Sequence, residues 1–172
     1  MRLGAAARRR AALATVLGAV VAAAWPGPAS APAQAPASRA AWATVNACDP
    51  PQRPASVGIR VAIPNRADLA QWVRIRVQFF DRGRRVWKVV RSGGDTGFKK
   101  LSDGGGRVSG GTTFMFTPPR AGARLKLRGR VDVEWRRGRR ARSHARLITE
   151  GGHADPADPL LLVSQPFCEI RR

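Results

Sequence analysis

From Cys48 to Cys168 the chain repeats one pattern, in which apolar and polar side chains alternate at every second position. The pattern is clearest over residues 72–81 and 125–135. Successive side chains of a β-strand point to opposite faces of its sheet, so this period of two predicts strands with one face in a core and the other in water. Helical periodicity is nearly absent, and the sequence therefore predicts an all-β domain. In residues 125–135 the water-facing positions are all charged: Lys126, Arg128, Arg130, Asp132 and Glu134.

Turn signals divide this region into short strands. Clusters of Gly, Pro, Asn and Asp interrupt the apolar alternation every 8–15 residues, as in antiparallel sandwiches and barrels. Residues 92–97 and 103–106 are expected to be loops. Seven or eight antiparallel strands packed as a β-sandwich are therefore predicted, at 41–48, 56–63, 72–81, 86–90, 107–116, 125–135, 141–149 and 160–170.

The N-terminal segment has the features of an export signal. Arg2 and Arg8–Arg10 precede an uncharged apolar run, residues 11–24, and a stretch rich in Pro and Ala follows. The run is 14 residues long, shorter than the ~20 that span a bilayer. We predict a signal peptide with a signal helix over residues 1–35, a disordered flexible spacer over 36–40 and the β-sandwich over 41–172. Retention of the segment as an anchor is the alternative.

Cys48 and Cys168 are the only cysteines, and they lie near the two ends of the predicted sandwich. A cysteine pair in an exported chain usually forms a disulfide. Metal binding would require further ligands, and the two histidines, His144 and His153, have no paired spacing. A catalytic thiol would leave the second cysteine unexplained. A disulfide and a secreted, extracellular or cell-wall-associated location are therefore expected.

The chain is strongly basic, with 31 Lys and Arg against 11 Asp and Glu. Of these basic residues 27 are Arg. Codon bias in a GC-rich genome explains an excess of Arg and Ala without a polyanionic partner. A functional polycation that meets anionic glycan, phospholipid or nucleic acid outside the cell is the alternative.

The densest basic segment is the expected turn 136–142, which carries Arg136, Arg137, Arg139, Arg140 and Arg142. Guanidinium groups match phosphate, sulfate and carboxylate groups, so this turn is the candidate anion-binding site. Arg84 and Arg85 would add to it if the two turns lay at one end of the domain. No aromatic residue is interleaved with these arginines, which argues against binding of single-stranded nucleic acid.

No pattern of catalytic residues was found. Ser109 lies in a Gly-rich segment without a nucleophile-elbow motif. His153 could be oriented by Asp155, which leaves an enzyme using His153 as an alternative. Asp132 and Glu134 share a strand face with arginines, which favours ion pairs with a neighbouring strand. We predict no catalysis, no cofactor and no metal site.

The Val131-Asp-Val-Glu-Trp135 strand and the number of strands resemble immunoglobulin-like and fibronectin type III modules. A second set of segments is spread over most of the predicted domain: Trp42, Asn46–Cys48, Val57–Ile63, Arg74–Gln78, Thr149–Pro156, Ser164 and Cys168–Ile170. In these segments the chain resembles a group of secreted actinobacterial proteins without an assigned activity, so this resemblance implies the fold and a secreted location only. For the domain itself we predict a structural, adhesive or binding role. The expected partners are an extracellular protein or an anionic cell-wall polymer, without specific nucleic acid recognition and with membrane contact only during export. Extracellular nucleic acid is the alternative polyanion.

Overall fold

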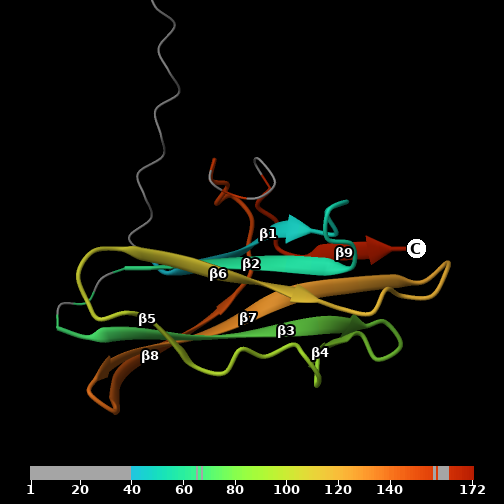
Figure 1. Ribbon diagram of the computed structural model, residues 1–172. Helices are drawn as coiled ribbons and strands as arrows, with labels where there is room; N and C mark the ends of the chain where they lie inside the picture. The colour runs from blue at the N-terminus through green and yellow to red at the C-terminus, as the bar shows by residue number, and fades with distance from the viewer. Residues whose placement is uncertain (1–39, 65, 67, 157, 159–162) are drawn as a thin grey trace, which may run out of the picture. The chain divides into compact units, whose positions relative to one another are not determined.

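The computed structural model describes residues 40–172 except 65, 67, 157 and 159–162, all within the compact unit Pro36–Arg172. The described residues form strands and no helix (Figure 1). The predicted all-β class is confirmed for this part of the chain. The nine strands are β1 (Trp42–Cys48), β2 (Ser56–Ile63), β3 (Ala70–Asp81), β4 (Val86–Val89), β5 (Lys99–Ser102), β6 (Val108–Met115), β7 (Arg124–Arg137), β8 (Arg140–Ile148) and β9 (Cys168–Arg171).

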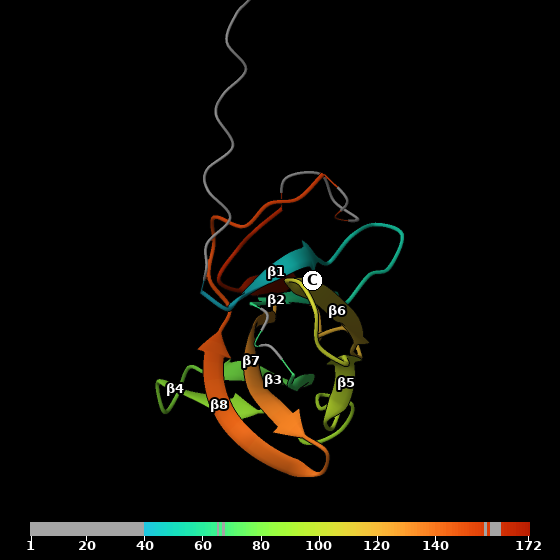
Figure 2. The same ribbon diagram turned by 90° about the vertical axis from the view of Figure 1, so that its left-hand side faces the viewer.

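The strands form two antiparallel sheets in a β-sandwich-like arrangement (Figures 1 and 2). One sheet has three strands in the order β1-β2-β6. The other has six, with β4-β3-β7-β8 as its main path. In this second sheet β5 and β4 lie on the same side of β3, with β5 paired to its start and β4 to its end. In the same way β9 and β8 lie on one side of β7, with β9 paired to its start. The long central strands β3 and β7 therefore define its face.

The core lies between the sheets and follows the predicted alternation. Every second residue of β7 from Leu127 to Trp135 is buried, and the residues between them are more exposed. Gly129 occupies one inward position because a Cβ there would lie 2.7 Å from Thr149 Cγ2 and 2.9 Å from Ile59 Cδ1. The buried apolar cluster draws on both sheets: Val45, Val57, Ile59, Val61, Ile63, Val73, Ile75, Val77, Phe114, Leu127, Val131, Val133, Trp135 and Ile170.

The predicted disulfide is confirmed. Cys48 and Cys168 are bonded, with their Cα atoms 5.2 Å apart. Cys48 ends β1 in the three-stranded sheet, and Cys168 begins β9 in the six-stranded sheet. The bond therefore links the two sheets and closes a chain segment of 120 residues. Such a bond is consistent with an extracellular location.

One strand was not predicted, and another was predicted too long. Residues between the loops 92–97 and 103–106 form β5, a four-residue strand that lacks a clear period of two. The last strand, predicted at 160–170, is Cys168–Arg171; residues 163–167 are not part of it, and residues 160–162 lie outside the described residues. Pro166 lacks an N–H, so it interrupts pairing just before this strand, and Gln165 forms an isolated bridge with Val45 of β1.

The predicted signal peptide, 1–35, and the spacer before Ala40 lie outside the described residues. Over the residues that are described, no helix has the length and hydropathy needed to cross a membrane.

Candidate anion-binding face

The Arg-rich turn is a two-residue β-hairpin between β7 and β8. Arg137 pairs with Arg140, and Gly138 and Arg139 form the turn. Gly138 has a φ of 57°, and a glycine at the first central position is typical of a type II′ turn. A register shift next to Trp135 leaves Arg142 as the extra residue of a β-bulge in β8. The hairpin therefore gathers its arginines at one end of the six-stranded sheet.

The five predicted arginines fall into two groups. Arg136 Nε donates a hydrogen bond to Glu134 at 2.6 Å, and its guanidinium lies over the rings of Trp72 and Phe98. The other four side chains are exposed. Within the described part of the chain, no carboxylate lies within ion-pairing distance of these four residues, which we call the tip arginines: Arg137, Arg139, Arg140 and Arg142.

Arg84 and Arg85 lie at the opposite end of the sheet, so the condition under which they would add to this turn is not met. Antiparallel pairing of β3 with β7 places Ala70 beside Arg136 and Phe79 beside Leu127. The β3–β4 turn follows Asp81, at the far end of β3 (Figure 1). Eleven residue steps at about 3.3 Å each separate the two ends by about 36 Å.

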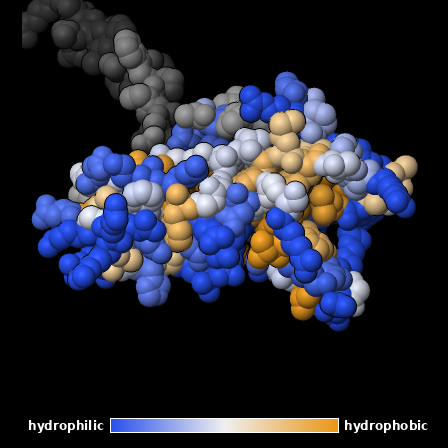
Figure 3. Space-filling model, turned by 60° about the horizontal axis from the view of Figure 1, so that its bottom comes forward, coloured by the Kyte–Doolittle hydropathy of each residue, from blue (hydrophilic) through white to orange (hydrophobic). Residues whose placement is uncertain are grey.

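The outer sheet face between the two turns is itself basic. Arginine occupies two outward positions of β3 and three of β7, and β8 adds one more. On this side of the molecule hydrophilic residues predominate, and an apolar patch interrupts them (Figure 3). The arginines on this face are Arg74, Arg76, Arg128, Arg130, Arg136 and Arg146. We call these six residues and the four tip arginines together the basic strip.

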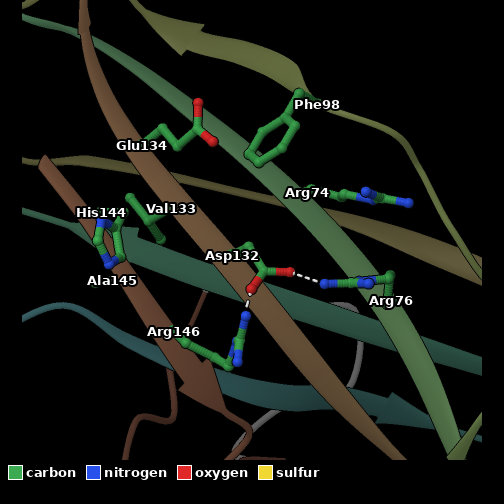
Figure 4. Close-up of a pocket in the computed structure, with 9 residues that line it drawn as sticks. All are labelled: Arg74, Arg76, Phe98, Asp132, Val133, Glu134, His144, Ala145 and Arg146. Carbon is green, nitrogen blue, oxygen red and sulfur yellow. Dashed lines mark hydrogen bonds and ion pairs between the residues drawn. The ribbon is translucent and has the colours of Figure 1, made fainter. Parts of the chain in front are cut away.

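Asp132 lies at the centre of the basic strip. Its carboxylate accepts hydrogen bonds from Arg76 and, at 2.9 Å, from Arg146 (Figure 4). Arg130 Nη2 lies 3.8 Å from the same carboxylate. Burial raises the pKa of Asp132, but the hydrogen bonds from the arginines more than offset this, so the pKa lies below its ordinary value. Arg76 comes from β3 and Arg146 from β8, so the predicted ion pairs with neighbouring strands are confirmed for Asp132.

Asp95 neutralises the edge of the same face. Arg74 Nη2 lies 2.5 Å from an Asp95 oxygen, and the hydrogen bond from Arg74 is the main reason that the pKa of Asp95 is lowered. Arg74, Arg76, Asp132, Glu134, His144 and Arg146 line an open depression of about 610 Å³ beside Phe98 (Figure 4). The centre of the strip is thus partly neutralised, whereas the hairpin is not.

Aromatic rings accompany the arginines at both ends of the strip. Arg136 lies 4.5 Å from the ring centroid of Trp72, and Arg128 lies 4.2 Å from that of Trp87. Burial lowers the pKa of Arg128. The prediction that no aromatic residue is interleaved with the arginines was wrong for this face, because the rings come from distant segments. Trp72, placed on the outward phase of β3, was the available sequence signal.

His153 lies on the other sheet, away from the basic strip. Its ring stacks on Trp42 with centroids 4.2 Å apart, and its Nε2 lies 3.0 Å from Glu150 Oε1. Asp155 forms an ion pair with Arg60 at 2.8 Å. These contacts attach the segment after β8 to the three-stranded sheet. His144 is exposed on β8, opposite Glu134, and Ser109 Oγ bonds to Val61 O within the β2–β6 pair.

Among the described residues, no group of three His, Cys, Asp or Glu side chains could hold a metal ion. Comparisons with protein-family models, curated proteins and solved structures found no match for this chain.

Proposed function

We propose that this chain is an exported, non-catalytic, immunoglobulin-like binding module whose ligand is an extended anionic polymer. The polymer lies along the basic strip and is held most strongly by the tip arginines. Export is proposed from the signal-like residues 1–35, and the disulfide is consistent with it.

The strand order supports an immunoglobulin-like or fibronectin type III-like module. The sheets β1-β2-β6 and β4-β3-β7-β8 correspond to strands A-B-E and C′-C-F-G of such sandwiches. Trp135, 2% exposed, lies at the inner face of the strand equivalent to F. Two features are additions to that plan: the strands β5 and β9, and a disulfide that joins the first and last strands.

The observation that carries the proposal is the uneven neutralisation of charge. Ten of the eleven acidic side chains lie within ion-pairing distance of an Arg, Lys or His. In the part of the chain that the structure describes, none of these carboxylates lies within ion-pairing distance of the tip arginines, although four cations are packed there into six residues. Unpaired guanidinium groups remain available to bind an external phosphate, sulfate or carboxylate.

The length of the strip favours a polymer over a small anion. A single phosphate or sulfate would occupy one arginine cluster, whereas the arginines of β7 from Arg128 to Arg137 are nine residue steps apart, or about 30 Å along the sheet. Alternate residues of one strand lie about 6.7 Å apart, so a flexible chain of anions can meet several guanidinium groups in succession. The aromatic rings under Arg136 and Arg128 hold these guanidinium groups against the sheet.

The salt dependence of binding tests this proposal. The probe is a fluorescently labelled single-stranded oligonucleotide of mixed sequence, titrated with the disulfide-bonded protein by anisotropy between 50 and 200 mM salt. Replacing Arg137, Arg139 and Arg140 with Gln removes three cation contacts. The slope of log K against log salt should fall by about 2, since each contact to a single strand contributes about 0.7. The wild-type affinity should therefore decrease about 20-fold more than that of the variant over this range.

A matched variant removes the same charge elsewhere. Arg53, Arg107 and Arg120 are exposed residues outside the strip, and changing all three to Gln should leave the slope nearly unchanged. Equal slopes for the two triple variants would show that only the net charge matters and would refute the site. Inorganic polyphosphate and polyglutamate, used as competitors, then report whether phosphate or carboxylate polymers bind more tightly.

A further inference from the structure

Strand β6 is a free edge of the three-stranded sheet. It pairs with β2 over eight residues, from Val108 opposite Ile63 to Met115 opposite Ser56, without a bulge. Among the described residues no strand pairs with its other side. Figure 2 shows β6 at the end of its sheet, beside β2. An unpaired edge of this length is a template for another strand.

The hydrogen-bond phase shows which residues of β6 face outward. Phe116 N donates to Ala55 O at 2.9 Å, in register with the β2–β6 ladder. Hydrogen bonding alternates from residue to residue along an antiparallel pair, so the even-numbered residues of β6 direct their N–H and C=O groups to β2. The edge therefore presents the backbone groups of Ser109, Gly111, Thr113 and Met115.

This edge lacks the features that usually block strand addition. Its sequence, Val-Ser-Gly-Gly-Thr-Thr-Phe-Met, contains no charged residue and no proline. By contrast, the edge strands of the other sheet carry Lys88, Lys99 and several arginines. The opposite edge of the small sheet, at β1, is covered because Val45 exchanges two 3.0 Å backbone hydrogen bonds with Gln165.

An apolar groove continues from the end of this edge. It has a volume of about 490 Å³ and is lined mainly by Phe79, Val90, Met115, Phe116 and Leu125. Met115 is 69% exposed, the most exposed large apolar side chain described. Charged residues on an edge strand usually prevent another chain from pairing with it. Strand β6 carries no charged residue, and its open edge continues into the apolar groove.

We propose that β6 pairs antiparallel with β6 of a second copy of this chain, with a twofold axis at Thr112. In this register Ser109 lies opposite Met115 and Gly111 lies opposite Thr113, so the outward backbone groups of both copies are satisfied. The core-facing residues of one copy also meet core-facing residues of the other. Val108 of the second copy then lies beside Phe116, at the mouth of the apolar groove.

Charge favours this strand as the contact between two copies. Residues 40–172 contain 26 basic and 11 acidic residues, so two copies repel one another through most of their surfaces. A neutral edge on the sheet opposite the basic strip lets the copies meet with the least repulsion. The pairing is independent of the proposed function, and its test uses no polyanion.

A cysteine placed on the proposed axis tests the register. Directly opposite residues of a non-hydrogen-bonded pair have Cα atoms about 4.5 Å apart, which is within the range of disulfides. Thr112→Cys, oxidised after the Cys48–Cys168 bond has formed, should give a covalent dimer on a non-reducing gel. Ser109→Cys is the control, because its two copies would lie about 20 Å apart. Equal cross-linking of both variants, or none with Thr112→Cys, overturns the proposal.

Sedimentation velocity of the full chain supplies a second measurement. The wild type should show a monomer–dimer equilibrium that shifts toward dimer as salt is raised, because salt screens the repulsion between copies. Thr113→Lys should weaken dimerisation at least tenfold, and Gln52→Lys, an equal charge at an exposed turn, should not. A monomer at every salt concentration, or a dimer that Thr113→Lys leaves intact, contradicts the pairing.

Discussion

Removing the Cys48–Cys168 disulfide should destabilise the domain more than any single truncation in its core. The two residues are separated by 120 positions and belong to different sheets. In the unfolded chain the bond closes a very long loop, whereas in the folded chain it joins strands that are already held by the core. Its main effect is therefore expected on the entropy of the unfolded state.

The size of the effect follows from the loop length. For a loop of 120 residues the chain-entropy relation gives about 5 kcal/mol at 25 °C. A domain of about 130 residues has an unfolding entropy near 0.27 kcal/mol/K. The melting temperature of the Cys48→Ala/Cys168→Ala variant should therefore lie roughly 15–20 °C below that of the oxidised wild type. Cys168 is fully buried, so its truncation adds a small packing loss in the same direction.

Calorimetry of the oxidised wild type and the double alanine variant measures this difference. Wild-type protein unfolded in the presence of a reductant is the control, since it loses the bond but keeps both sulfur atoms. It should melt near the variant, and the small difference between them reports the lost packing. A decrease of less than about 5 °C for both would refute the argument that the unfolded state carries the effect.

Two further substitutions test the strip and the core. Asp132→Asn frees Arg76 and Arg146 from their shared carboxylate. Oligonucleotide binding should therefore tighten, its salt slope should steepen by about 0.7 to 1.4, and the melting temperature of the protein should fall. Weaker binding would show instead that Asp132 positions the arginines for the ligand. Gly129→Ala places a Cβ within 3 Å of the Thr149 and Ile59 side chains. Chemical denaturation should show that the free energy of unfolding decreases by about 1–3 kcal/mol. An unchanged free energy of unfolding would mean that the sheets separate easily at this point.

Much of the fold was predictable because side-chain alternation reports directly on burial. The inward phase of β7 could be assigned residue by residue, since one of its faces is buried in the core and the other is more exposed. The four-residue β5 was missed because it is too short to show a period, and it pairs only with the start of β3. The start of the last strand was placed too early because its first turn signal, Pro166, was not weighed: residues 163–167 are not strand, and β9 begins at Cys168.

The candidate site was only partly visible in the sequence for a different reason. A run such as 136–142 is contiguous and can be recognised directly. The basic strip is assembled across β3, β7 and β8, so it depends on strand order and register, which side-chain alternation does not specify. The position of Arg84 and Arg85 shows this most clearly: both turns are Arg-rich, and only the antiparallel pairing of β3 with β7 places them at opposite ends.

The hairpin geometry also bears on why the chain is so rich in arginine. A genomic preference for Arg accounts for the choice of Arg over Lys at any position. It does not explain why the described carboxylates form ion pairs elsewhere and not with the tip arginines. Arg137 and Arg140 lie directly opposite one another across the two-residue turn, and like charges in that position destabilise a β-ladder. The repulsion persists in the free protein because no carboxylate of the described residues lies within ion-pairing distance of the tip arginines. A bound polyanion would relieve it, so the hairpin gains stability from its ligand in addition to supplying the contacts that hold it.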